Sequence, residues 1–171
     1  MSVLQKTLEQ AINVSDVILL TGGISVGDYD FVLQAAENCG VTKLFHRIKQ
    51  RPGKPLYFGK KENKLIVGLP GNPSSVLTCL YEYALPALQQ LGNQCKGLKK
   101  IEVPLSSAIN KTVGLTHFLK GYYDGEKVLP LGAQESYRLS SFAKANCLIQ
   151  IEENTTHCEI GEKVTIHLLP E

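Results

Sequence analysis

The sequence predicts an α/β fold for residues 1–95 and a small all-β, barrel-like fold for residues 96–171. In the first part, stretches with helical spacing of apolar residues alternate with short β-rich runs, and glycine-rich turns follow two of those runs. In the second part, only short β-like runs follow one another between turns. A chain of 171 residues that is 43% hydrophobic can bury two small cores, which is compatible with two domains.

The first part contains three predicted helices and four predicted strands. The helices are expected at residues 3–12, 28–39 and 73–91, and the strands at 17–20, 44–49, 56–58 and 65–69. The unbroken apolar run 17–20 is typical of a parallel strand covered on both faces. Asp28 can cap the second helix and Gly40 can end it, whereas Pro86 should kink the third. The polar turn 60–64 predicts that the last two strands form a hairpin.

The second part begins after a linker expected at residues 96–100, so we place the domain boundary at residues 95 and 96. Its β-like runs are 101–109, 117–123, 127–131, 147–152 and 163–169. The dipeptide of Asp124 and Gly125 is a hairpin signal between the second and third of these runs. Because the strands are short and evenly spaced, they favour a small barrel or sandwich.

Composition excludes several classes of protein. A net charge of +2 with 20% charged residues indicates neither a disordered chain nor a general nucleic-acid binder. No apolar run approaches the ~20 residues of a membrane-spanning helix, and the N-terminus lacks the apolar core of a secretory signal, so we expect a cytoplasmic protein. The five cysteines form no C-x-x-C pair and the four histidines show no ligand spacing, which predicts reduced structural thiols and no zinc site.

The first motif that could carry chemistry is the glycine-rich segment 20–30, between a predicted strand and a predicted helix. It holds Gly22, Gly23, Ser25, Gly27, Asp28 and Asp30. Glycines let backbone N–H groups approach an anion, and open α/β sheets bind ligands at this edge. The serine adds a hydroxyl donor, and the two carboxylates could hold Mg²⁺ at a phosphate site. A tight turn followed by an aspartate cap explains the same residues without a ligand.

The second motif is the turn 51–55, in which two prolines and a glycine present Arg51 and Lys54 from a rigid backbone. Eight Lys or Arg residues against one acidic residue, Glu62, lie between residues 43 and 64. This local excess favours an anionic substrate, because the chain as a whole has only two more basic than acidic residues. A solvated basic face explains most of these lysines equally well. It explains Lys54 less well, because the rigid turn fixes the position of this residue.

The third motif is the turn 68–75, a second strand-to-helix connection. Asn72 fits an N-cap and Pro73 the first helical position, and Ser74 could donate to a phosphate or a heterocycle. An ordinary capped helix is the alternative interpretation. No Ser-His-Asp constellation is present in the sequence pattern, since no nucleophile elbow occurs.

In order and spacing, these motifs resemble the MoeA/gephyrin family of molybdenum insertases. The matching segments are 21–30, 52–55, 68–73 and 139–146. The resemblance implies a partial three-layer, MogA-like molybdopterin-binding domain at 1–95 and the C-terminal barrel-like domain at 96–171. It also implies an enzyme, a molybdopterin molybdenumtransferase of molybdenum cofactor biosynthesis, that inserts molybdate into adenylylated molybdopterin, releases AMP, uses Mg²⁺ and acts as a homodimer.

The resemblance also implies roles for individual residues. The molybdate-binding residues would be Ser25, Arg51, Lys54 and Pro55. The pterin- or nucleotide-binding residues would be Gly22, Gly23, Gly27, Asp28, Gly71, Asn72, Pro73 and Ser74. Lys120 and Ser136 would be contributed by the last domain. Asp30 would be catalytic together with Lys54, and it would also be the Mg²⁺ ligand.

The sequence departs from the family pattern at two positions. Arg51 stands where the family often has lysine, and Lys120 stands where arginine is frequent; both keep the positive charge, although a guanidinium is a planar fork and an ammonium is not. An α/β domain that starts with a helix and a single parallel strand suggests that residues upstream are missing. For such a fragment we expect bound substrates with little or no turnover.

Two other functions compete with this one. The molybdopterin adenylyltransferase, which is also a candidate partner, shares the α/β domain, but it usually has a Gly-Thr-Gly element where residues 24–27 stand, and no β-rich domain follows it. A gephyrin-like interaction scaffold would need an apolar groove for a partner peptide but no oxyanion pocket. Molybdate binding therefore discriminates between an insertase and a scaffold.

Overall fold

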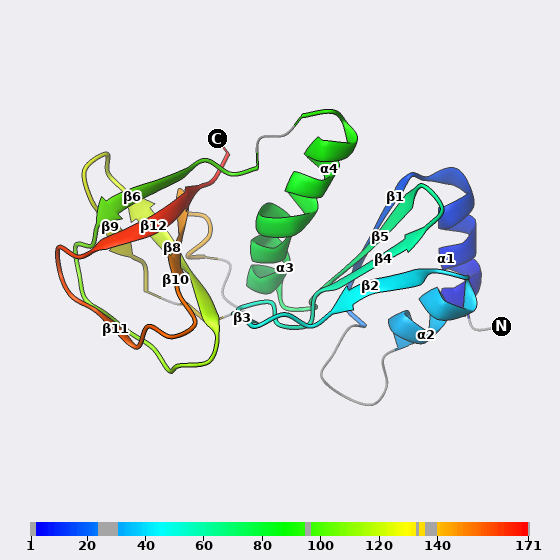
Figure 1. Ribbon diagram of the computed structural model, residues 1–171, viewed down its shortest axis with the longest axis horizontal. Coiled ribbons are helices and arrows are strands. Elements are labelled where there is room, and N and C mark those ends of the chain that lie inside the picture. The colour runs from blue at the N-terminus through cyan, green and yellow to red at the C-terminus, as the bar shows by residue number, and fades with distance from the viewer. Residues whose placement is uncertain (1–2, 24–30, 95–96, 133, 136–139, 171) are drawn as a thin grey trace. The chain divides into compact units, whose positions relative to one another are not determined.

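The computed structural model describes residues 3–23, 31–94, 97–132, 134–135 and 140–170 (Figure 1). The helical elements are α1 (Val3–Val14), α2 (Phe31–Asn38), α3 (Pro73–Cys79), the π-helix η1 (Leu80–Ala84) and α4 (Leu85–Leu91). The strands are β1 (Val17–Thr21), β2 (Thr42–His46), β3 (Gln50–Arg51), β4 (Tyr57–Lys61), β5 (Lys64–Leu69), β6 (Lys100–Pro104), β7 (Ile109–Asn110), β8 (Thr116–Tyr123), β9 (Val128–Pro130), β10 (Cys147–Ile151), β11 (His157–Cys158) and β12 (Lys163–Leu168).

The chain divides into two compact units. Unit 1 consists of Met1–Ile48 and Gly53–Asn72, and unit 2 of Lys49–Pro52 and Pro73–Glu171. The short segment with β3 and the helices α3, η1 and α4 thus belong to the same unit as the C-terminal strands. The domain boundary that the sequence predicts at residues 95 and 96 stays a prediction.

Unit 1 is a four-stranded sheet with two helices on one face (Figure 1). The strand order is β1-β5-β4-β2, in which β1 and β5 are parallel and the other pairs antiparallel. Helices α1 and α2 pack on the sheet through one apolar cluster, to which Leu8, Ala36 and Ile66 belong. The predicted hairpin of β4 and β5 is confirmed, and its turn is tight because Glu62 adopts a positive φ of 52°.

Two expectations for unit 1 are corrected. The strand β1 is parallel as predicted, but it is not covered on both faces, because Leu19 is 41% exposed while Ile18 is buried. The strand predicted at 44–49 instead covers Thr42–His46 and ends before Arg47, whose φ of 68° lies in the left-handed region that interrupts an extended chain.

Unit 2 carries a sheet of six strands in the order β3-β8-β10-β12-β6, with β9 paired to β8. A second, two-stranded sheet pairs β11 with β7; sequence periodicity missed β11 because it is only two residues long. The core of this β part is one apolar cluster that includes Val128, Ile149 and Ile166. In the described strands the sheet stays open at β3 and β6, so the fold is barrel-like without closing.

The predicted hairpin at Asp124 and Gly125 is confirmed between β8 and β9. The Asp124 carboxylate accepts hydrogen bonds from the backbone N–H groups of Glu126 and Lys127, both at 2.9 Å. These bonds lower the pKa of Asp124. Gly125 supplies the positive φ of 106° that the turn requires.

The helix predicted at 73–91 is not a single kinked α-helix. It is α-helical at both ends and π-helical at Leu80–Ala84, where the N–H of Leu85 donates to the carbonyl oxygen of Leu80. Pro86 has no N–H, so the α-helical bond to residue 82 cannot form, and the rearrangement is accommodated in the turn before the proline.

Candidate functional site

The two glycine turns predicted to bind the substrate lie side by side in unit 1. They follow the parallel strands β1 and β5, whose register places Thr21 opposite Leu69. The N–H of Gly22 donates to the carbonyl oxygen of Leu69 at 3.3 Å, and a Cβ at Gly71 would lie 3.6 Å from the Cα of Gly22. The structure therefore brings the two turns together at one edge of the sheet.

The conformation of the first turn requires glycine. Gly22 and Gly23 have φ values of 77° and 67°, in the left-handed region that other residues rarely adopt. A Cβ at Gly23 would also come within 3.0 Å of Cγ2 of Val32, where helix α2 packs against the turn. The turn thus presents backbone without side chains at the carboxyl ends of two parallel strands, the place where open α/β sheets bind ligands.

Several predicted site residues cannot be placed. Ser25, Gly27, Asp28, Asp30 and Ser136 lie outside the described residues. Their proposed roles stay predictions.

The turn 51–55 is divided between the two units. Arg51 ends β3 in unit 2 and is joined to Pro52 by a cis peptide bond. Lys54 and Pro55 belong to unit 1, where the carbonyl oxygen of Lys54 accepts hydrogen bonds from the N–H groups of Ile48 and Leu56 at 2.9 and 3.0 Å. Both predicted cations, Arg51 and Lys54, have exposed side chains.

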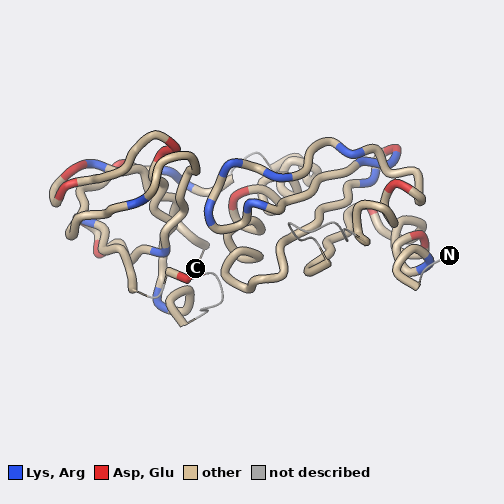
Figure 2. Tube along the Cα trace, turned by 90° about the horizontal axis from the view of Figure 1, so that it is seen from below, with Lys and Arg blue, Asp and Glu red and all other residues tan. Residues whose placement is uncertain are grey.

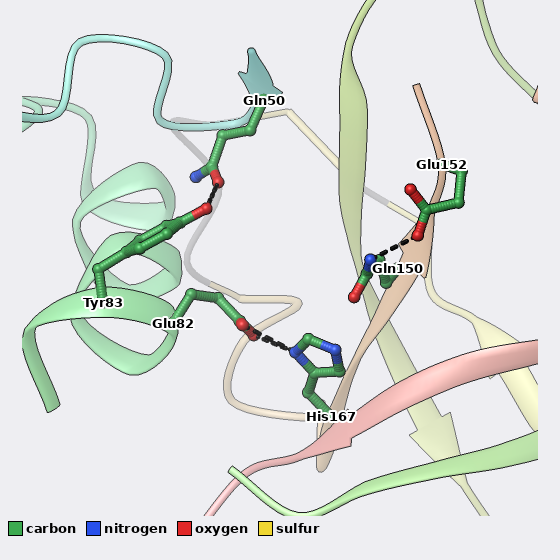
Figure 3. A network of polar contacts seen from close by, with 6 residues as sticks. All are labelled: Gln50, Glu82, Tyr83, Gln150, Glu152 and His167. Atoms are coloured by element: carbon green, nitrogen blue, oxygen red, sulfur yellow. Dashed lines mark hydrogen bonds and ion pairs between the residues drawn. The ribbon is translucent and has the colours of Figure 1, made fainter. Parts of the chain in front are cut away.

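A buried amide holds the backbone beside Arg51. Gln50, which is 2% exposed, donates from Nε2 to the carbonyl oxygen of Pro52 at 2.8 Å and to Sγ of Cys79 at 3.6 Å. Its Oε1 accepts the hydroxyl hydrogen of Tyr83 (Figure 3). Burial raises the pKa of Tyr83 to about 12, so the phenol stays protonated and can only donate to this amide oxygen at neutral pH.

The π-helix presents two consecutive side chains for polar contacts. Tyr83 reaches Gln50, and the neighbouring Glu82 receives a hydrogen bond from Nδ1 of His167 on β12, 2.7 Å from both carboxylate oxygens (Figure 3). The side chains of Glu82 and His167 are 7% and 1% exposed. Sequence reasoning missed Gln50, Tyr83 and this buried pair, because residues that are 33 and 85 positions apart give no local signal.

Unit 2 contains a pocket of about 620 Å³. We call it the unit 2 pocket; it is lined by Arg51 of β3 and Pro52, by segment 108–112, by 117–119 of β8, and by Ser75, Pro130, Gln134 and Glu135. Arg51, whose predicted role is to bind an anion, lines this pocket. Ser75 lines it too, whereas the predicted ligand Ser74 is fully buried and its hydroxyl has no partner among the described residues.

His117 also lines the unit 2 pocket, directly beside Arg51 in the register of the parallel strands β3 and β8. It is only 7% exposed. Burial lowers its pKa, and the positive charges of Lys111 and Arg51 lower it further. Sequence reasoning did not select His117, because its distance of 66 residues from Arg51 hides the pairing.

Lys120 is the predicted contribution of the last domain, and the structure buries it to 2% exposure. Its Nζ lies 3.5 Å from the carbonyl oxygen of Glu135 and 5.8 Å from the ring centroid of Phe142. Its backbone exchanges hydrogen bonds with the amide of Gln134 at 2.9 and 2.8 Å. Burial lowers the pKa of Lys120, and the charge of Glu135 opposes that effect.

Positively charged residues are concentrated in one segment of the sequence. Lys and Arg recur along residues 43–64, where Glu62 is the one acidic residue (Figure 2).

Within the described part of the chain, no group of three or more His, Cys, Asp or Glu side chains could hold a metal ion. None of the described helices is long and apolar enough to cross a membrane. The four described cysteines are buried and form no disulfide with one another.

Comparison with known proteins gives two family matches. Residues 1–90 match the family described as "Probable molybdopterin binding domain". Residues 102–169 match the family described as "MoeA C-terminal region (domain IV)".

Similar proteins and structures agree with both matches. A molybdopterin molybdenumtransferase of Haemophilus influenzae is 36% identical over 96% of this chain and 43% of its own length. A molybdopterin molybdenumtransferase of Nostoc sp. is 31% identical over 98% of this chain and 41% of its own length. A crystal structure of a molybdopterin biosynthesis MoeA protein from Pyrococcus horikoshii superimposes with a TM-score of 0.80 at 28% identity, over 96% of this chain and 40% of that protein. The chain thus spans about two fifths of the length of these relatives.

Proposed function

We propose that this chain, which belongs to the molybdopterin-binding MoeA family, forms part of an enzyme that transfers molybdenum to molybdopterin. One observation carries the proposal. The two glycine turns at Gly22 and Gly71 meet at the carboxyl ends of parallel strands, where backbone without side chains suits the close approach of an anionic substrate. The names of the relatives support molybdopterin and molybdate as the substrates.

The finer chemistry belongs to the same proposal. The substrate is adenylylated molybdopterin, and AMP leaves when molybdate is inserted. Molybdate is a dianion and the pterin substrate carries phosphate and thiolates, so their mutual repulsion must be screened. Fixed cations and oriented N–H donors screen it without reorganising when the reaction occurs.

We propose the following binding roles for the individual residues. Gly22, Gly23, Gly71, Asn72 and Pro73 form the pterin or nucleotide cradle, with Gly27, Asp28 and Ser74 as the further candidates. Arg51, Lys54 and Pro55, together with Ser25, bind molybdate. Lys120 and Ser136 complete the binding residues from the C-terminal part. Burial of Lys120 supports a role in which its charge acts at short range through a medium of low dielectric constant.

Mg²⁺ is the metal ion that this family implies. Asp30 is the residue we assign to it, and a carboxylate beside a phosphate site has the oxygen ligands that Mg²⁺ prefers. When bound, the ion would neutralise the phosphate charge that develops as AMP departs. Within the described residues, no group of three or more His, Cys, Asp or Glu side chains could hold a metal ion.

Assembly and location are also part of the proposal. We propose a cytoplasmic homodimer that can receive its substrate from a molybdopterin adenylyltransferase. The chain spans about two fifths of the length of these relatives.

The test is molybdate retention in equilibrium dialysis at neutral pH, with the metal measured by mass spectrometry. We expect the chain to retain molybdate and Lys54→Ala to lose most of this retention. Lys60→Ala is the matched control, because it removes an exposed lysine from the same unit without a predicted role. Equal retention by wild type and Lys54→Ala, or no retention by the wild type, would contradict the proposal.

A further inference from the structure

The imidazole of His117 has an environment that its structural role does not explain. It is 7% exposed, and its Nε2 has no hydrogen-bond partner among the residues that the structure describes. Nearly all buried polar groups in native proteins are paired, and leaving one unpaired destabilises the fold. The ring lies on β8, between Arg51 of β3 and Ile151 of β10, and it lines the unit 2 pocket.

The charges that face His117 are predominantly positive. Arg51 and Lys111 line the same pocket, and both lower the pKa of the imidazole after burial has lowered it. Among the described residues, Glu135 is the one acidic residue that lines the pocket, and it lies beside the buried cation Lys120. Glu153 contributes its backbone oxygen to Lys111, while its carboxylate is paired with Lys49 at 2.8 Å.

The two cations of the pocket differ in what they can still bind. The ammonium of Lys111 donates to the backbone oxygens of Leu115 and Glu153 at 2.9 and 3.1 Å, so it supplies charge more than contact. Arg51 is exposed, and its guanidinium forms no hydrogen bond or ion pair within the described part of the chain. A guanidinium fork is suited to two oxygens of one anion.

We propose that the unit 2 pocket is an oxyanion subsite in which Arg51 and the imidazole of His117 together bind one tetrahedral anion. The ligand class is that of a phosphate monoester or a tetrahedral metal oxyanion, and this class rests on the proposed function. Apolar walls from Pro52, Leu119 and Pro130 exclude part of the solvent and strengthen both contacts. His117 is a binding residue beyond those that the sequence motifs select.

The subsite couples anion binding to proton uptake. In the free protein His117 is neutral at neutral pH, because burial and two cations depress its pKa. A bound dianion favours the imidazolium, so it raises the pKa of His117. Between the lowered pKa of the free protein and the raised pKa of the complex, binding therefore takes up a proton, and the anion binds more tightly as pH falls through that window.

The experiment is an NMR titration of the histidine side chains between about pH 5 and 8, with and without sodium sulfate. Sulfate is a tetrahedral dianion that does not titrate in this range. We expect sulfate to raise the pKa of His117 by about half a pH unit or more and to leave the ring signals of the exposed His157 unchanged. A His117 pKa that does not move at saturating sulfate, phosphate or tungstate overturns the inference.

Variants sharpen this test. His117→Gln should still bind sulfate but lose the pH dependence, and Arg51→Gln should lose most binding. Lys163→Gln, which removes an exposed lysine outside the pocket, is the control and should bind as the wild type does. Sulfate binding in His117→Gln with an unchanged pH dependence would contradict the role of the imidazole.

Two further comparisons identify the source of the bound anion and distinguish failure of this inference from failure of the proposed function. At pH values where tungstate remains monomeric, a larger response of His117 to phosphate assigns the subsite to a substrate phosphate, and a larger response to tungstate assigns it to the metal oxyanion. If molybdate is retained in a manner that depends on Lys54 while His117 responds to no anion, this inference fails alone. If His117 responds but molybdate is not retained, the proposed function fails and the subsite stands.

Discussion

Replacing His167 by phenylalanine should destabilise unit 2 strongly. The side chain of His167 is 1% exposed and donates from Nδ1 to the carboxylate of Glu82, whose side chain is 7% exposed (Figure 3). Phenylalanine has a similar shape and fits beside the ring of Phe118, 5.6 Å away between centroids, so packing is largely kept. The loss is the partner of a buried carboxylate, which costs about 3–5 kcal/mol when one side of a buried pair is removed.

The assay is urea denaturation followed by circular dichroism, with the free energy of unfolding taken from the transition of unit 2. Glu82→Leu should also destabilise, and the double variant should lose about 2 kcal/mol less than the sum of the two single losses, because the residues contact each other. His157→Phe is the matched control: the exposed pair of His157 with Glu159 is worth at most about 1 kcal/mol. A loss below about 1 kcal/mol for His167→Phe, or strict additivity, would refute the reasoning.

Three further predictions concern single contacts. Tyr83→Phe leaves Oε1 of the buried Gln50 without its donor, so it should destabilise by about 1–3 kcal/mol and weaken sulfate binding, as calorimetry would show; unchanged stability would contradict the role of the hydroxyl. Gly121→Ala would place a Cβ 2.8 Å from a β10 side chain and should cost about 1–3 kcal/mol in thermal unfolding, whereas Gly132→Ala meets open space and should change little. The thiol of Cys79, whose pKa burial raises to about 12, should be about a thousandth ionised at pH 9 and resist alkylation in the native state; alkylation as fast as in the unfolded chain would contradict this.

Local patterns in the sequence predicted most elements of the fold. The β4–β5 hairpin and the turn at Asp124 and Gly125 follow from side-chain alternation and turn chemistry, which are short-range properties. The π-helix η1 could not be predicted. Pro86 indicates that a helical bond is missing, but the surrounding packing decides in which turn the chain accommodates the loss.

The candidate site was only partly predictable for a related reason. Gly22 and Gly71 are found from sequence because each follows a strand, and parallel pairing then brings their turns together. Arg51 was selected by its charge and its rigid turn. Its neighbour His117 and the contact of Gln50 with Tyr83 required the tertiary register, because pairing between distant strands and helices leaves no trace in local periodicity.

The most direct test of the molybdate-binding account is the anomalous diffraction of crystals soaked in tungstate, a heavy analogue of molybdate. We predict a tungsten peak at the predicted oxyanion ligands Ser25, Arg51 and Lys54, and its loss in crystals of Lys54→Ala. Crystals of Lys60→Ala, which removes an exposed lysine of unit 1, should keep the peak. Fully soaked, well-ordered wild-type crystals without a peak at these residues, or a peak that persists in Lys54→Ala, would contradict the account.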